Sequence, residues 1–367
     1  MNTEGGSFMK KKLMAVLLAG AMVFSMVACG GSDNSTAESN ETGATSEPTT
    51  ETSSDVKIGL ITDTGGVNDG SFNQSAWEGL QRAQADYGIE VNYLESKTDS
   101  DYTPNIEQFM DEEYDLIICV GYQLADALRT AAEANPDQKF AIIDDSSCAD
   151  LENVSCLMFR QEQASYLVGY VAGLTTETNT VGFVLGMENE TMNQFGYGFC
   201  AGVLDANADA TVLQSNANSF SDPAIGKSNA NTMITNKADI IFHAAGGTGL
   251  GVIQACQEAG IKAIGVDSDQ SSIAPDTVIT SAMKRVDNAV YDSAKSIVEG
   301  TYAAGVITYD LSMGGVDIAP TTDLLDDETI AAVNEVKEKI LSGEVKVPTN
   351  KDEFEAAYGD VYTLDDK

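Results

Sequence analysis

Residues 56–73 (VKIGLITDTGGVNDGSFN) decide the fold class of this 367-residue chain. The segment begins with a continuous apolar run, passes through a loop of small and polar residues, and leads into an amphipathic pattern over residues 73–87. A strand without apolar–polar alternation is typical of a parallel sheet that helices cover on both faces. The segment therefore predicts an α/β fold that begins at Val56.

The same succession of strand and helix patterns continues along the chain in two similar blocks. Strands are predicted at residues 56–62, 89–94, 115–120 and 140–143, and then at 180–185, 210–214, 239–244, 262–266 and 278–281. Helices are predicted at residues 73–87, 105–113, 124–134, 163–175, 192–206, 226–235, 249–259, 288–302 and 327–341. This order predicts an α/β chain with two similar halves. The length agrees, because single cores rarely grow past roughly 250–300 residues.

The composition excludes several classes of function. The chain has 57 Asp and Glu against 20 Lys and Arg, a formal net charge of −37, and one histidine. A strongly acidic protein is repelled by phosphate backbones, so nucleic acid is not an expected partner. The single histidine argues against His-based catalysis and against the common zinc sites. We therefore expect a binding protein rather than an enzyme, with no metal and no cofactor.

The N-terminus has the pattern of an export signal. Lys10, Lys11 and Lys12 precede an apolar run at residues 13–24, which is shorter than the ~20 residues that span a bilayer. Met26-Val27-Ala28-Cys29 resembles a bacterial lipobox, with Met where Leu is more usual. This resemblance implies that residues 1–28 are a lipoprotein signal peptide and that Cys29 is lipidated. The alternative is an ordinary cleaved signal with a cysteine there by chance.

The segment after Cys29 is expected to be a tether. Residues 30–55 contain no Val, Ile, Leu or aromatic residue, and all their charges are acidic. Such a segment buries too little apolar surface to offset its chain entropy. Residues 29–55 are therefore predicted to be a lipidated cysteine and a disordered tether, which would hold the following domain at the outer face of the cell membrane.

Five cysteines follow Cys29, namely Cys119, Cys148, Cys156, Cys200 and Cys256. The odd number and the apolar surroundings of several of them favour buried free thiols. A Cys148–Cys156 disulfide is the alternative in an exported protein.

The residues that follow the predicted strands indicate a ligand-binding cleft. Open parallel sheets bind ligands outside the carboxyl ends of their strands. These positions carry small, polar or acidic residues at 63–73, 144–146, 218–222, 246–249 and 267–270, and their only aromatic residues are Phe72 and Phe220. Carboxylates accept hydrogen bonds from hydroxyl groups, and two phenyl faces can enclose a planar ring. The pattern therefore favours a polar, ring-bearing ligand that is uncharged or cationic.

Each of these residues has a structural alternative. Asp63, Asn68 and Asp69 are types that cap turns and helix starts, and Phe72 and Phe220 could be hydrophobic staples beneath loops. The glycine run at 246–251 could be a tight turn, and the basic pair at 284–285 a surface feature. Sequence reasoning alone leaves these alternatives open.

Seven segments together resemble the basic membrane protein family of bacterial substrate-binding lipoproteins, whose best understood branch is the purine nucleoside receptor type. They are DTGGVNDGSFNQSAWEG (63–79), FAIID (140–144), FRQEQASYLVGYVAGLT (159–175), SFSDPAIG (219–226), AGGTGLG (245–251), GVDSDQ (265–270) and SAMKRVD (281–287). The resemblance implies a type I periplasmic-binding-protein fold, with two Rossmann-like lobes joined by three crossovers. Lobe 1 would hold residues 56–160 and about 285–310, and lobe 2 residues 161–284 and about 311–367.

The resemblance also implies a role for eight residues. Phe72 and Phe220 would stack on a nucleobase, and Asp144 would bind the edge of the base, with Asp145 and Asp126 as competing assignments. Asp267 and Lys284 would hold the ribose hydroxyls, with Lys284 keeping the Asp267 carboxylate ionised. Gly246 would offer a backbone contact. Asp63 and Asn73 would add further polar contacts.

The implied function is capture of a purine nucleoside outside the cell and its delivery to the permease of an ABC importer. The protein would be a monomer that is held at the membrane by its lipid anchor. Two alternatives remain from the residues alone. The same fold could bind a sugar or another small metabolite as a sensor, or Asp63 and Asp69 could hold a divalent cation in a nucleoside hydrolase.

Overall fold

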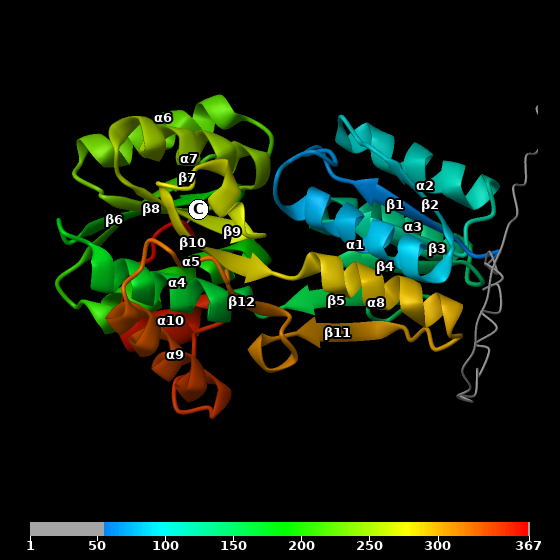
Figure 1. Cartoon of the computed structure of the whole chain (residues 1–367). Helices are drawn as coiled ribbons and strands as arrows, with labels where there is room; N and C mark the ends of the chain where they lie inside the picture. The colour runs from blue at the N-terminus through cyan, green and yellow to red at the C-terminus, as the bar shows by residue number, and fades with distance from the viewer. Residues whose placement is uncertain (1–54, 366–367) are drawn as a thin grey trace, which may run out of the picture. The chain divides into compact units, whose positions relative to one another are not determined.

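The computed structural model of the chain describes residues 55–365 (Figure 1). The predicted signal peptide, Cys29 and nearly all of the predicted tether lie outside these residues. Within the described range, no helix is both long enough and apolar enough to cross a membrane.

Two six-stranded sheets form the cores of two lobes (Figure 1). The sheet of lobe 1 has the order β2 (Glu90–Leu94), β1 (Lys57–Thr62), β3 (Leu116–Val120), β4 (Lys139–Ile143), β5 (Val154–Phe159) and β11 (Gly305–Tyr309), and its neighbours pair in parallel. The sheet of lobe 2 has the order β7 (Thr211–Asn216), β6 (Thr180–Leu185), β8 (Ile240–Ala244), β9 (Lys262–Asp267), β10 (Val278–Lys284) and β12 (Val316–Ile318). Its strands pair in parallel except for β12, which runs antiparallel to β10. The two sheets thus repeat one order of strands.

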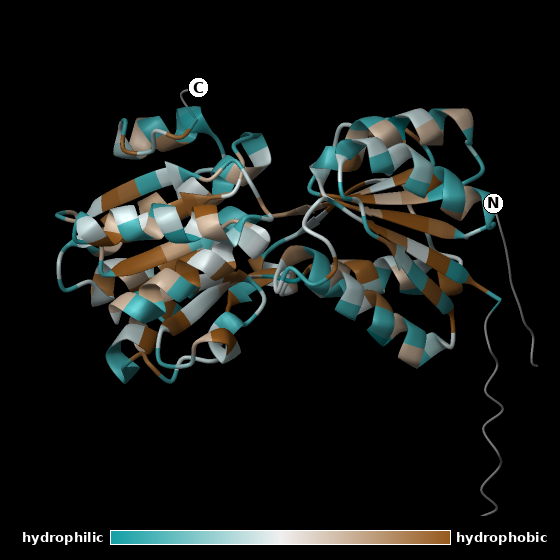
Figure 2. Ribbon diagram, turned by 90° about the horizontal axis from the view of Figure 1, so that it is seen from above, coloured by the Kyte–Doolittle hydropathy of each residue, from teal (hydrophilic) through white to brown (hydrophobic). Residues whose placement is uncertain are grey.

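Helices cover the sheets, as the continuous apolar strands predict. The helices of lobe 1 are α1 (Phe72–Tyr87), α2 (Tyr102–Asp111), α3 (Ala125–Ala134) and α8 (Val286–Val298). Those of lobe 2 are α4 (Gln161–Thr175), α5 (Glu190–Ala206), α6 (Pro223–Thr235), α7 (Gly246–Ala259), α9 (Asp327–Leu341) and α10 (Lys351–Tyr358). All five residues of β3 are buried, and Figure 2 shows apolar strands between helices of mixed polarity. Burial of both sheet faces therefore drives the formation of each lobe.

The chain passes between the lobes three times. It leaves lobe 1 at Arg160, between β5 and α4, and α4 packs against α5 and β10 of lobe 2. It returns at Arg285, between β10 and α8, and α8 packs against α1 (Figure 1). The third passage joins β11 to β12. The two lobes with three crossovers that the resemblance implies are present.

Some predicted element bounds were wrong. The helix predicted at residues 105–113 begins earlier, at Tyr102, because proline is tolerated in the first turn of a helix, where Pro104 lies. The helix predicted at 288–302 ends at Val298, and Gly300 follows with φ of 67°, a conformation that favours glycine. Three strands and one α-helix were missed, namely β5, β11, β12 and α10.

The five cysteines of the described chain are all free and buried. The prediction of buried thiols is confirmed, and the alternative Cys148–Cys156 disulfide is wrong for this structure. Burial raises the pKa of Cys119 and of Cys200, because an apolar interior disfavours the thiolate.

Candidate ligand-binding site

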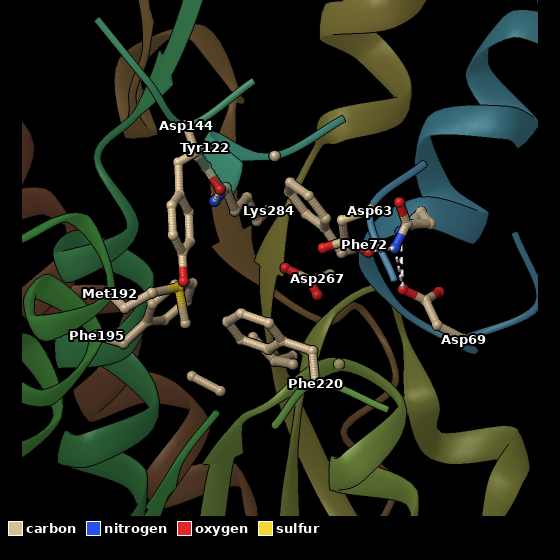
Figure 3. A pocket seen from close by; sticks show the side chains of 15 residues that line it. Asp63, Asp69, Phe72, Tyr122, Asp144, Met192, Phe195, Phe220, Asp267 and Lys284 are labelled. Carbon is tan, nitrogen blue, oxygen red and sulfur yellow. Dashed lines mark hydrogen bonds and ion pairs between the residues drawn. The ribbon is translucent and has the colours of Figure 1, made fainter. Parts of the chain in front are cut away.

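A pocket lies between the two lobes (Figure 3). It is lined by Asp63, Asp69, Phe72, Asn73, Gly121, Tyr122, Asp144, Met192, Phe195, Phe220, Ala244, Gly246, Val266, Asp267 and Lys284. The structure thus places all eight candidate residues in one pocket. Neither Asp145 nor Asp126 lines it, because Asp145 binds Ser147 in its own loop and Asp126 is exposed on α3.

Asp144 and Asp267 occupy equivalent places in the two lobes. Asp144 directly follows β4 and Asp267 ends β9, and each of these strands is fourth in the order of its sheet. Both residues have left-handed backbones, with φ of 66° and 65°, and both are buried. A residue other than glycine pays of order 1–3 kcal/mol for such a conformation, and strain of this kind gathers at functional sites. The fold therefore holds one carboxylate from each lobe against the pocket.

Lys284 forms a buried ion pair with Asp144. Its Nζ lies 2.5 Å from Oδ2 of Asp144, and the side chains are 2% and 5% exposed. The ammonium group also lies over the rings of Phe72, Phe159 and Phe195, at 5.2, 5.1 and 5.5 Å from their centroids. These rings add cation–π attraction to the ion pair. The surface alternative for Lys284 is therefore wrong.

The expected partnership of Lys284 with Asp267 needs a correction. Burial raises the pKa of Asp267 to about 7, although Lys284 and the hydroxyl of Ser71 act in the opposite direction. Asp69 and Asp144 add to the rise, because like charges disfavour a further carboxylate. Lys284 forms its ion pair with Asp144 and not with Asp267. The expectation that Lys284 keeps Asp267 fully ionised is therefore wrong.

Asp69 caps the start of α1. Its carboxylate accepts the backbone N–H groups of Ser71, Asn73 and Gln74 at 2.9, 2.9 and 3.1 Å. These donors belong to the first turn of the helix, which has no partners of its own for them. The capping alternative is therefore correct for Asp69, even though the residue borders the pocket.

Asn73 presents an acceptor to the pocket. Its Nδ2 donates to Asp63 at 2.8 Å and to Asp69 at 3.0 Å, which fixes the orientation of the amide. Its Oδ1 is buried and has no hydrogen-bond partner within residues 55–365. The same holds for Oδ1 of Asp144 in the described chain. Buried polar atoms are nearly always paired in native proteins, so these two atoms are suited to a ligand that donates hydrogen bonds.

Asp63 is buried beside Asn73. It accepts the backbone N–H of Gly65 at 2.8 Å and the Asn73 amide. Burial raises its pKa to about 6, which outweighs these two hydrogen bonds. Both of its recorded partners are groups of its own lobe, so it holds the loop that presents Asn73.

The aromatic residues come from both lobes. Phe72 begins α1 of lobe 1, and Phe220 lies in the loop between β7 and α6 of lobe 2 (Figure 3). Phe220 packs so closely on Gly186 that a Cβ there would lie 2.3 Å from its ring. Gly246 has φ of 51°, and its backbone lies against Phe220. The glycines therefore fix where the ring of Phe220 lies.

The larger lining residues that were missed at the sequence level are Tyr122, Met192 and Phe195. Tyr122 follows β3 after Gly121, and its ring meets that of Phe220 edge-on, with centroids 6.5 Å apart. It lies at a strand end, so the rule that located the other candidates could have found it. Met192 and Phe195 lie on α5, and only the docking of this helix brings them to the pocket.

The pocket favours neutral or cationic ligands that donate hydrogen bonds. Of the described residues that line it, Lys284 is the one cation, and its charge is balanced by Asp144. Among residues 55–365, no group of three or more His, Cys, Asp or Glu side chains could hold a metal ion. The two expected aromatic faces and the two unpaired acceptors are the main features that a ligand would meet.

Comparison with known proteins supplies the family. The model of the family described as "ABC transporter substrate-binding protein PnrA-like" matches residues 56–351. The chain belongs to this family. Its members are binding components of ABC transporters, so the protein is a substrate-binding protein and not an enzyme.

Curated relatives support this family. The chain is 34% identical over 364 residues to the "ABC transporter nucleoside-binding protein BmpA" of Lactococcus lactis, a match that covers 93% of this chain and all of the relative. It is 36% identical to "Basic membrane protein A" of Borreliella burgdorferi, covering 82% of this chain and 89% of the relative. The resemblance to the basic membrane protein family is thereby confirmed.

Solved structures support the fold. A solute-binding protein of an ABC transporter system from Aeropyrum pernix aligns with a TM-score of 0.76 at 27% identity, over 83% of this chain and 97% of that chain. The arabinose-binding protein AraP of Geobacillus stearothermophilus aligns with a TM-score of 0.57 at 14% identity, over 72% and 97%. The predicted type I periplasmic-binding-protein fold is confirmed.

Removing the carboxylate of Asp144 should destabilise the protein. Asp144→Ala leaves the buried Lys284 ammonium without its counter-ion, and the expected cost is about 3 kcal/mol or more in the free energy of unfolding. The double variant Asp144→Leu/Lys284→Met removes both charges and should recover most of this loss. Chemical denaturation measures both, with Glu258→Ala in the exposed pair with Lys227 as a control that should change stability by less than about 1 kcal/mol. Equal stability of Asp144→Ala and wild type would contradict the burial of this pair.

Stability should fall as the pH rises from about 4 to about 7, in part because of Asp267. Its pKa is about 7 in the folded protein against 3.8 for an unperturbed aspartate, so the folded state binds the extra proton in this interval. The stabilisation is complete below the unfolded pKa and is lost as the pH rises through the folded pKa, with a contribution on the order of 4 kcal/mol. Asp267→Asn should remove this part of the pH dependence, as measured by urea unfolding at pH 4, 5.5 and 7.5. Parallel curves for the variant and wild type would show that Asp267 titrates normally.

Proposed function

We propose that the protein captures a purine nucleoside outside the cell and delivers it to the permease of an ABC importer. The observation that supports this most directly is the position of Phe72 and Phe220, which line one pocket from opposite lobes. A planar base between two phenyl rings gains stacking energy of roughly 1–3 kcal/mol where this has been measured in nucleic-acid binders. The name of the Lactococcus lactis relative, a nucleoside-binding protein, agrees with this choice.

The polar groups are assigned to the two parts of the nucleoside. We assign Asp144 to the edge of the base, because its Oδ1 is buried without a partner in the described chain while Oδ2 is held by Lys284. Asp267 is assigned to the ribose hydroxyls, and Lys284 has further N–H donors that can reach them. Asn73 Oδ1 adds an acceptor that Asp63 and Asp69 orient. Gly246 offers a backbone contact beside Phe220.

The charges favour a nucleoside over a nucleotide. Asp63, Asp144 and Asp267 are buried at the pocket, and Lys284, the one lysine among the described lining residues, is already paired. A phosphate group would lie among carboxylates without a free counter-ion, and like charges in a region of low dielectric repel strongly. The neutral ribose and base meet no such penalty.

Calorimetry on the mature lipoprotein in detergent tests the ligand. Inosine, guanosine or adenosine should bind with a Kd in the micromolar range or tighter, whereas the monophosphates should bind at least about tenfold more weakly. Phe72→Leu and Phe220→Leu should each weaken binding roughly five- to hundredfold, because leucine fills space without a stacking face. Phe220→Tyr keeps the ring and serves as the matched control. Binding of ribose or arabinose with no binding of any nucleoside would favour the sugar alternative instead.

The lipid anchor is proposed to be at Cys29. The lipobox-like residues 26–29 support it. A Cys29→Ala variant should lose metabolic labelling by palmitate and move from the membrane fraction to the soluble or secreted fraction. Cys119→Ala, in a buried position of lobe 1, is the control that should keep both the label and the location. Undiminished labelling of Cys29→Ala would exclude this anchor.

A further inference from the structure

Two short segments meet across the lobes beside the pocket. The hydroxyl of Ser71, in lobe 1, donates to Oδ2 of Asp267, in lobe 2. The side-chain amide of Gln270, in lobe 2, donates through Nε2 to the carbonyl oxygen of Gly70 at 2.9 Å. Ser71 and Gln270 are each 1% exposed. Gly70 and Ser71 of lobe 1 thus bind Gln270 and Asp267 of lobe 2.

The hydroxyl of Ser71 is available for this contact because Asp69, rather than Ser71, caps the start of α1. Ser71 is the N-cap residue of α1, a position where serine commonly caps the helix with its own hydroxyl. Here its side chain makes no capping hydrogen bond within the described chain. The Asp69 carboxylate instead accepts the first backbone N–H groups of the helix. The hydroxyl of Ser71 is therefore left to donate to the other lobe.

The amide of Gln270 is oriented by its own lobe. Its Oε1 accepts the backbone N–H of Val266 at 3.0 Å and lies 3.1 Å from Nε2 of His243. Burial lowers the pKa of His243 to about 4, so the ring is neutral. Because the amide oxygen Oε1 can only accept, the hydrogen bond requires the proton on Nε2 of His243. The oxygen is thereby fixed within lobe 2, and the NH₂ group must face Gly70. The donor is positioned independently of lobe 1.

We propose that Ser71 and Gln270 form a latch that stabilises the closed arrangement of the lobes, with Gln270 as a positioning residue that His243 orients. The proposal rests on the proposed function, in which the ligand lies between the lobes. Asp267 belongs to both the latch and the ligand site, because one of its oxygens accepts from Ser71 and the carboxylate is assigned to the ribose. Ligand binding at Asp267 and closure of the latch therefore use the same side chain. Neither Ser71 nor Gln270 lines the pocket.

The latch predicts an effect on dissociation more than on association. Its hydrogen bonds form when the lobes meet, so their loss should speed opening without changing the open protein. Ser71→Ala and Gln270→Met should each raise the dissociation rate of inosine about tenfold and change its association rate by less than about twofold. Ser71→Thr, which keeps the hydroxyl, should dissociate at a rate near wild type. Gln138→Met is the matched control, because it removes glutamine-to-carbonyl hydrogen bonds inside lobe 1.

A second measurement tests the latch without any ligand. Spin labels at Ser146→Cys and Ser221→Cys, both exposed at strand ends of different lobes, report the distance between the lobes by dipolar spectroscopy on the mature protein. The double variant Ser71→Ala/Gln270→Met should shift the distances to longer values, and Gln138→Met should not. Unchanged distances together with unchanged dissociation rates would overturn the latch.

The outcomes separate the latch from the proposed function. If wild type binds no nucleoside while the distances respond to the variants, the ligand assignment fails and the latch stands. If Gln270→Met is unstable on thermal unfolding, Ser71→Ala decides the question, since it removes a single oxygen atom.

Discussion

The site depends on two aspartates that end equivalent strands in left-handed conformations. Asp144 and Asp267 direct one carboxylate from each lobe to the same pocket, and the backbone strain is carried by two well-buried sheets. Because β4 and β9 are fourth in their sheets, the repeated topology brings both residues to the facing ends of the lobes. Each carboxylate then acquires a different partner. Asp144 pairs with Lys284, and Asp267 accepts from Ser71.

This difference separates the chemistry of the two carboxylates. The ion pair, with three aromatic rings around the ammonium group, supplies Asp144 with a full counter-charge. Asp267 has only a hydroxyl and a more distant lysine, so burial dominates and raises its pKa to about 7. A strongly acidic chain thus builds a pocket whose net charge is much smaller than its composition suggests. Such a pocket suits a neutral ligand that is rich in hydroxyl and N–H groups.

The sequence predicted the fold class and most of the elements, because burial of both sheet faces leaves continuous apolar runs in the sequence. It did not predict β5, because a loop without a helix joins β4 to β5 and the alternation of strand and helix breaks there. In β11 half-buried and exposed residues alternate and only Tyr309 is buried, so this short edge strand resembles many loops in sequence. Element bounds were inaccurate near Pro104 and Gly300, where local backbone preferences compete with the apolar pattern.

The eight candidate residues could be placed at strand ends from the sequence and from a family resemblance, because strand order brings such positions together. The sequence could not show that Lys284 pairs with Asp144, that Asp69 caps α1, or that Tyr122, Met192 and Phe195 complete the pocket. Local patterns determine which residues form strands and helices and which polar side chains follow them. The partners of Lys284 and Ser71 are decided only when the lobes dock, because Asp144 and Asp267 lie far from them in the chain.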